Sequence, residues 1–89
     1  MQTEQQAAKM NKMAVHNIIE STLRGGSKVP GPLALVKVLA VRRELERCNS
    51  TDEVVAALAR HQPLIVKSFG LTDAAYDAGV EKIKALDRG

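Results

Sequence analysis

The chain has few of the side chains that build disulfides, metal sites and base-stacking platforms. Among its 89 residues are one cysteine, one phenylalanine, one tyrosine and no tryptophan. A single cysteine excludes an internal disulfide, and no Cys or His residues cluster at the short spacings of metal sites. Both aromatic side chains are expected to point inward, which disfavours binding of single-stranded nucleic acid by stacking. We therefore expect no metal, no cofactor and no enzymatic activity.

Long apolar runs are also missing from the sequence. A transmembrane helix needs about 20 consecutive apolar residues, and a secretory signal needs a basic segment followed by an apolar one. Because the chain has neither, we expect a cytoplasmic protein that does not enter a membrane. The N-glycosylation acceptor sequence at Asn49–Thr51 is then expected to remain unmodified.

The remaining composition is typical of a helix bundle. A chain of 89 residues builds one small core, which is marginal unless it is helical or completed by a partner. With so few aromatics, Leu, Ile, Val, Ala and Met must fill that core. We predict a single all-α domain over residues 1–89 with four to five helices. Residues 1–8 are expected to fray, and residues 25–32 to form a loop or hinge.

The segment 32–48 is the organising element of this predicted bundle. Its first half, residues 33–41, is interrupted only by Lys37, so a helix here is apolar around most of its circumference and should be surrounded. After Val41, apolar residues recur at steps of three and four among charged ones. A buried β-strand over 33–41 is the alternative. The helical continuation, with Pro32 suited to a first helical turn, favours one buried, central helix over about 32–48.

An amphipathic helix is predicted from Lys9 to Arg24. Its apolar side chains form two adjacent rows, because residues four apart lie on one face of a helix. Gly25 is expected to end this helix in the left-handed conformation. The apolar face either completes the core of its own chain or binds a partner. The residues of this candidate partner-binding face are Met10, Ala14, Val15, Ile18, Ile19 and Leu23.

A capping box marks the start of a helix after residue 50. The Ser50 hydroxyl is expected to accept from the Glu53 amide, while the Glu53 carboxylate accepts from the Ser50 amide. This helix should end near His61. Cys48 lies just before it, and the helix dipole together with Arg47 would lower the pKa of a reactive thiol there. We favour the alternative, a small buried hydrophobe.

Two further helices follow, each with its own boundary signals. Pro63 opens a short apolar helix that Gly70 closes. Thr72 caps the last helix, and Gly79 in its interior predicts a close helix contact near the short helix.

Residues 62–80 also match the spacing of a helix-turn-helix motif. Residues 70–72, a glycine, a leucine and a threonine, are followed by the inward Tyr76, as that motif requires. The outward positions of the second helix include Asp73 and Asp77, which repel phosphates and read no bases. We therefore favour a glycine-terminated helix followed by a capped one.

A basic helix face is the remaining indication of nucleic-acid binding. The net charge is +3, and residues 1–47 hold eight basic against four acidic residues. Glu44 and Glu46 lie among the arginines of segment 32–48 and can pair with them. Each such pair stabilises a helix by only about 0.2–0.5 kcal/mol. The candidate nucleic-acid-binding residues are Lys37, Arg42, Arg43 and Arg47.

Protein binding through an apolar helical face is the function we favour. The chain would act as a regulator, adaptor or assembly subunit, as a homodimer or within a complex, with no small-molecule substrate evident. DNA binding or a nucleoid-associated regulatory role is the alternative. Residues 47–58 resemble a stretch of the Hha-type nucleoid modulators through Arg47, Cys48 and Asp52. That family is all-helical and binds a DNA-organising protein, but the rest of this chain departs from its pattern.

Overall fold

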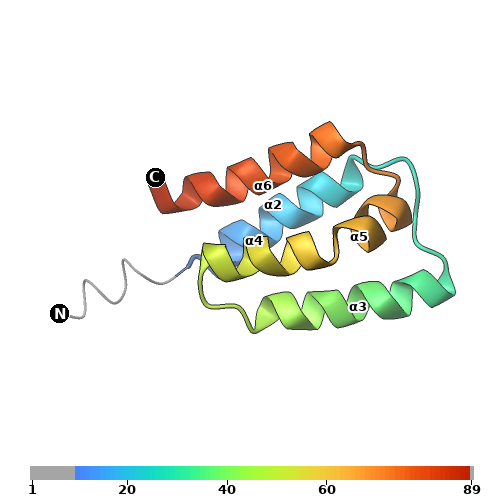
Figure 1. Ribbon diagram of the computed structural model, residues 1–89, viewed down its shortest axis with the longest axis horizontal. Coiled ribbons are helices and arrows are strands. Elements are labelled where there is room, and N and C mark those ends of the chain that lie inside the picture. Colours follow the sequence, from blue (N-terminus) through green and yellow to red (C-terminus); the bar gives the residue numbers. More distant parts are fainter. Residues whose placement is uncertain (1–9, 89) are drawn as a thin grey trace.

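The computed structural model describes residues 10–88, with side chains placed for residues 10–87. This part of the chain contains α-helices and no strand, which confirms the predicted small all-α bundle (Figure 1). None of its helices is long and apolar enough to cross a membrane. The predicted fraying of residues 1–8 lies outside the described residues. The helices are α2 (Lys12–Arg24), α3 (Pro32–Glu46), α4 (Thr51–Arg60), α5 (Gln62–Phe69) and α6 (Asp73–Arg88).

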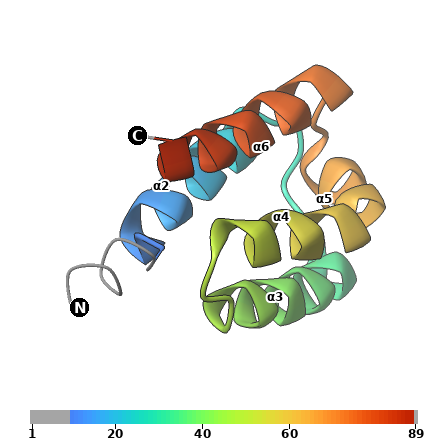
Figure 2. The same cartoon turned by 60° about the vertical axis from the view of Figure 1, so that its left-hand side comes forward.

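The extensive contacts between these helices form an open series and not a closed ring. α6 packs against both α2 and α4, and α3 packs against α4 and α5. α2 and α3 therefore stand at the two ends of the series, where they run in opposite directions (Figure 1). The turned view separates a layer of α2 and α6 from a layer of α3 and α4 (Figure 2).

The core is centred where α4 meets α6. Val54 and Ala57 of α4 and Ile83 of α6 are almost completely removed from solvent. At the edge of this contact the buried Thr51 hydroxyl donates a hydrogen bond to the Asp87 carboxylate. This bond satisfies a polar group that would be costly to bury alone, and it ties the start of α4 to the end of α6.

α3 forms at the predicted position, but the prediction that it is buried at the centre is wrong. Among its residues only Val41 is buried. Leu33 is 85% exposed and Val36 is 67% exposed. The physical reason is that α3 has neighbours, α4 and α5, on one face, while its first half is apolar on every face. A surplus of apolar surface therefore remains in solvent.

α2 differs from its prediction at both ends. It begins at the cap residue Asn11, whose side chain accepts a hydrogen bond from the Ala14 amide at 3.1 Å, so its first turn starts later than Lys9. The prediction that Gly25 is left-handed is wrong: its φ is −75°, in the right-handed region. Its amide instead donates to the Thr22 carbonyl at 3.1 Å, so a right-handed turn ends the helix.

The loop between α2 and α3 is anchored in its first half. The backbone amide of Ser27 donates to the Gly70 carbonyl at 3.2 Å, and that of Lys28 donates to the Phe69 carbonyl at 3.1 Å. Beyond these two bonds Val29 is exposed. Any hinge motion in this loop is therefore expected in its second half, after Lys28.

The capping box of α4 is present with one change. The Ser50 hydroxyl accepts from the Glu53 amide at 3.2 Å, as predicted. The Glu53 carboxylate accepts from the Asn49 amide at 2.8 Å, where the Ser50 amide was predicted. The reciprocal bond therefore reaches one residue further back. α4 ends at the cap residue His61, in agreement with the prediction.

The boundaries between α5 and α6 also agree with the sequence prediction. Gly70 is left-handed with φ 62°, and the Thr72 hydroxyl accepts from the Ala75 amide at 3.0 Å. The close contact predicted at Gly79 exists, but it lies against α2 and not α5. A Cβ atom at Gly79 would lie 2.6 Å from Thr22 Oγ1, so this glycine lets α6 approach α2.

Candidate functional site: a groove between α2 and α3

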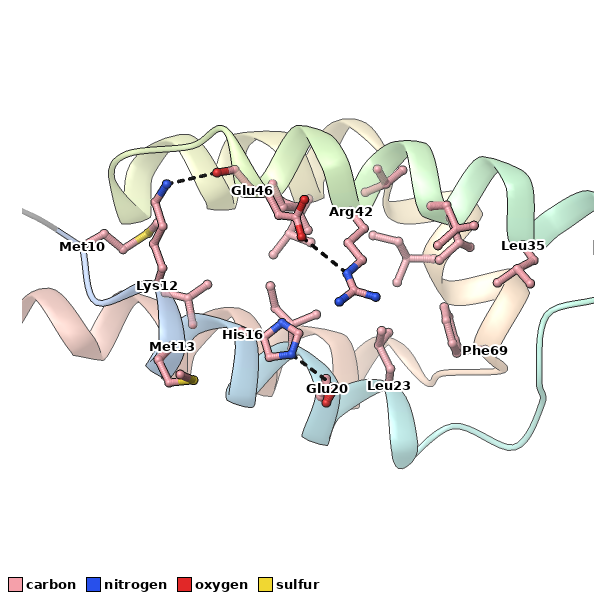
Figure 3. Close-up of a pocket in the computed structure, with 18 residues that line it drawn as sticks. Met10, Lys12, Met13, His16, Glu20, Leu23, Leu35, Arg42, Glu46 and Phe69 are labelled. Carbon is pink, nitrogen blue, oxygen red and sulfur yellow. Dashed lines mark hydrogen bonds and ion pairs between the residues drawn. The ribbon is translucent and has the colours of Figure 1, made fainter.

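An apolar groove of about 560 Å³ lies between α2 and α3 (Figure 3). The two helices form its walls, and Leu58, Ile65 and Phe69 from α4 and α5 contribute to its lining. Its volume falls within the range of about 300–1,000 Å³ found for ligand-binding clefts. The groove lies between the two end helices of this series, which have no extensive contact with each other.

The face predicted on α2 is divided between two neighbours. Val15, Ile19 and Leu23, together with Met10, line the groove. Ala14 and Ile18 do not line it. Four residues after Ile18, the same row reaches Thr22, which lies against Gly79 of α6. The first alternative is confirmed in part, because Val15 is buried in the core and Ile18, Ile19 and Leu23 pack against it. Binding of a partner stays a prediction.

The wall formed by α3 was not predicted as a site. Sequence reasoning assigned its apolar residues to the core. The signal was present in the sequence, because a small chain with an apolar face on α2 and a helix apolar on all sides has more apolar surface than one core uses. The lining residues of α3 include Leu35, Val38, Leu39, Val41 and Leu45.

One end of the groove is bridged by a hydrogen bond from α2 to α3. Lys12 Nζ donates to the Glu46 backbone carbonyl at 3.0 Å (Figure 3). Glu46 is the last residue of α3, where unsatisfied carbonyls and the negative end of the helix dipole favour a cation. The bond holds the walls together at this end.

The rim of the groove carries charges that are satisfied within each helix. Arg42 Nε lies 3.7 Å from Glu46 Oε2 on α3. His16 Nε2 lies 3.3 Å from Glu20 Oε1 on α2. Together with Lys12 the rim therefore holds two basic side chains, two acidic side chains and one histidine. Because the two signs balance, the rim selects weakly for the charge of an occupant.

The opposite end of the groove is apolar. Leu23, Leu35 and Phe69 surround it (Figure 3), and Leu39 lies one helical turn from Leu35. Leu35 is 45% exposed and Leu39 is 42% exposed. These partly exposed leucines make this end the place where an apolar occupant gains most from leaving water.

The four candidate nucleic-acid-binding residues do not form one basic face. Arg43 lies on α3 and Arg47 is the residue that caps its C-terminus; both are exposed and they are about one turn apart. Lys37 is about 120° away from Arg43 around the helix, since each residue turns the helix by about 100°. Arg42 belongs to the groove rim. The structure thus brings two of the four together.

Glu44 links α3 to the end of α4 outside the groove. Its carboxylate lies 2.9 Å from His61 Nε2 and also accepts a hydrogen bond from Arg60. The hydrogen bond from His61, followed by the one from Arg60, lowers the pKa of Glu44 below its ordinary value of 4.5. The carboxylate is therefore ionised near neutral pH, and its role is to hold α3 against α4.

Cys48 is buried and its Sγ lies 3.5 Å from the Glu44 carbonyl. Burial, and secondarily the Glu53 carboxylate, raise the pKa of this thiol. This shift is opposite in sign to that of a reactive cysteine, and the burial confirms the favoured interpretation. Over the residues that the structure describes, no group of three or more His, Cys, Asp or Glu side chains could hold a metal ion.

No family model, no curated protein and no solved structure matches this chain. The resemblance of residues 47–58 to the nucleoid modulators therefore gains no support from these comparisons. The function has to be argued from the geometry of the groove.

Proposed function

We propose that the protein is a protein-binding module whose α2–α3 groove takes the apolar face of a helix. One observation carries this proposal: the bundle is an open series of helices with an apolar groove between its two end helices. An added helix would contact both walls and the floor, as helices do in the groove-binding mode of peptide recognition. The protein would then act in the cytoplasm as a regulator, adaptor or assembly subunit.

The balance of charge supports a protein occupant over nucleic acid. Binding to phosphates requires an excess of Lys and Arg along the contact surface. The groove rim instead pairs each arginine or histidine with an acid on the same helix. Increasing ionic strength should therefore weaken the proposed complex little, whereas DNA binding through Arg43 and Arg47 would weaken steeply.

Site-specific photo-crosslinking tests the proposal. A photoreactive phenylalanine analogue is placed at Leu39 in the groove wall, and in the matched control at Ala74, which is exposed on α6. After irradiation in the native cell, we expect the Leu39 probe to give adducts whose crosslinked peptide is an amphipathic helix. The Ala74 probe should give none. Equal labelling from both positions, or adducts to nucleic acid, would contradict the proposal.

A further inference from the structure

We infer that the helix in the groove is α3 of a second copy of this chain, so that two copies interlock through their grooves. This inference rests on the proposed function, because it names the helix that the groove takes. It follows from the distribution of apolar side chains on α3, from the topology of the groove and from one pair of complementary charges.

The first half of α3 is apolar on three sides and has neighbours of its own chain on one. Val41 is buried on the side of α3 that packs toward α4 and α5, and the groove beside it is lined by Leu35 and Leu39 as well as by Val38 and Val41. Leu33 and Val36 lie on the third side and are 85% and 67% exposed. A helix that is apolar all round belongs in a core. A second copy can supply the neighbours that α3 lacks.

The topology of the groove lets two copies satisfy this need at once. α3 is a wall of its own groove, and among the described residues it also carries most of the exposed large apolar side chains. In a two-fold pair the helices lie in the order α2, partner's α3, α3, partner's α2. Each groove then contains one α3, so every interface is used and the assembly closes as a dimer.

The exposed side chains match this arrangement. The two copies of α3 run antiparallel across the two-fold axis, so that Leu35 of one copy meets Leu39 of the other. The side of α3 that carries Leu33 and Val36 then faces the α2 helix of the second copy. The insertion takes place at the apolar end of the groove, away from the bridge at Lys12.

Complementary charges support the same arrangement. Lys37 is the sole charged residue in the first half of α3, and it lies beside Leu33 around the helix. It therefore faces the α2 helix of the second copy, where Glu20 is the acid on the groove rim toward the apolar end. Glu20 already lies near His16 and Arg24 of its own helix, so Lys37 would join an existing ion pair at the rim. Two-fold symmetry places this Lys37–Glu20 pair at the interface twice.

Light scattering on the full chain and on single variants measures the association. We expect the unmodified chain to be a dimer at about 100 µM. Val36→Glu should give a folded monomer with unchanged helix content, because this side chain is exposed in the isolated chain but its charge would be buried in the dimer. We expect its dimerisation to be at least about 100-fold weaker. The control Ala74→Glu, on α6, should remain dimeric.

A charge exchange tests the arrangement of the two copies. Lys37→Glu and Glu20→Lys should each weaken the dimer by about threefold to tenfold, since surface ion pairs are modest. The double variant should recover the affinity of the unmodified chain. A dimer that withstands Val36→Glu would overturn the interlocked arrangement. A double variant whose loss of dimer affinity equals the combined losses of the two single variants would also overturn it.

The photo-crosslinking experiment separates failure of this inference from failure of the proposed function. An adduct between the Leu39 probe and α2 or α3 of a second copy supports the inference. If the chain is a monomer and its Leu39 probe reacts with a helix of another protein, the inference is overturned but the proposed function stands. If the probe of a monomer reacts with an apolar small molecule, both are overturned. A monomer that gives no adduct in the groove overturns both.

Discussion

α4 and the first half of α3 are both rich in valine, leucine and alanine, yet one is buried and the other is exposed. α4 concentrates its large apolar side chains on the faces toward α6 and α3, and Val54 and Leu58 are buried there. α3 spreads its apolar side chains around the helix, and Leu33 and Val36 remain in water. The comparison indicates that the core forms around α4 and α6. It also motivates our proposal that the apolar surplus on α3 serves contacts beyond one copy.

The largest expected difference between the two regions is the loss of stability when a large apolar side chain is replaced by alanine. Ile83→Ala at the α4–α6 contact should lower the free energy of unfolding by about 2–5 kcal/mol, because it opens a cavity in a fully buried site. Leu33→Ala, made in the Val36→Glu monomer, should change it by less than about 0.5 kcal/mol. Urea unfolding followed by circular dichroism measures both. Similar losses at the two positions would show that α3 belongs to the monomer core.

The contact between α2 and α6 should be sensitive to a single methyl group. Gly79→Ala gains about 1 kcal/mol in helix propensity, but its Cβ would lie 2.6 Å from Thr22 Oγ1 and overpacking costs about 1–3 kcal/mol. We expect a net loss of about 1 kcal/mol in the same unfolding measurement. Adding Thr22→Ala should restore the stability. A stabilising Gly79→Ala in the unmodified chain would mean that the two helices are not in close contact.

The attachment of α3 to α4 should depend on pH through Glu44. Its pKa is lowered in the folded state, so its contribution to stability is present above its ordinary pKa of 4.5 and is lost as the pH falls through the lower folded value. Unfolding measured from about pH 3 to about pH 6, an interval of roughly three units around that pKa, should show this loss. Glu44→Gln should flatten the pH dependence of stability in that interval. An unchanged profile in this variant would mean that other carboxylates cause the pH dependence.

The smallest expected effect concerns the start of α3. Its cap residue, Gly31, has no side chain to accept a hydrogen bond from the first turn, whereas Ser50 does so at the start of α4. Nothing lies within 4 Å of a Cβ atom built at Gly31, so a larger residue fits. Gly31→Asp should stabilise the monomer by about 0.3 kcal/mol, and Gly31→Ala should not. Differential scanning calorimetry on the Val36→Glu background compares the two, and a gain from alanine would exclude capping as the cause.

Local signals in the sequence predicted most helix boundaries. Ser50, Gly70 and Thr72 end or begin helices as expected, because capping depends on residues only a few positions apart. Gly25 was assigned a left-handed conformation that it does not have. The predicted close approach at Gly79 was correct, but the neighbouring helix was not, since sequence spacing gives no information about which element lies opposite.

The burial of α3 shows where sequence reasoning fails in a different way. The apolar pattern correctly indicates that this helix prefers to be surrounded. It does not state whether the surrounding elements come from the same chain. For this reason the α2 wall of the groove was partly predicted, through residues such as Val15 and Ile19, while the α3 wall was assigned to the core.

The most direct test of the account is the accessibility of the groove wall as a function of protein concentration. Leu39→Cys introduces a thiol into the groove, and the native Cys48 contributes little background because it is buried with a raised pKa. We expect its alkylation by a maleimide to slow markedly as the chain dimerises, while Ala74→Cys reacts at a constant rate. If Leu39→Cys also reacts at a constant rate at every concentration, α3 and the groove do not form the interface between copies.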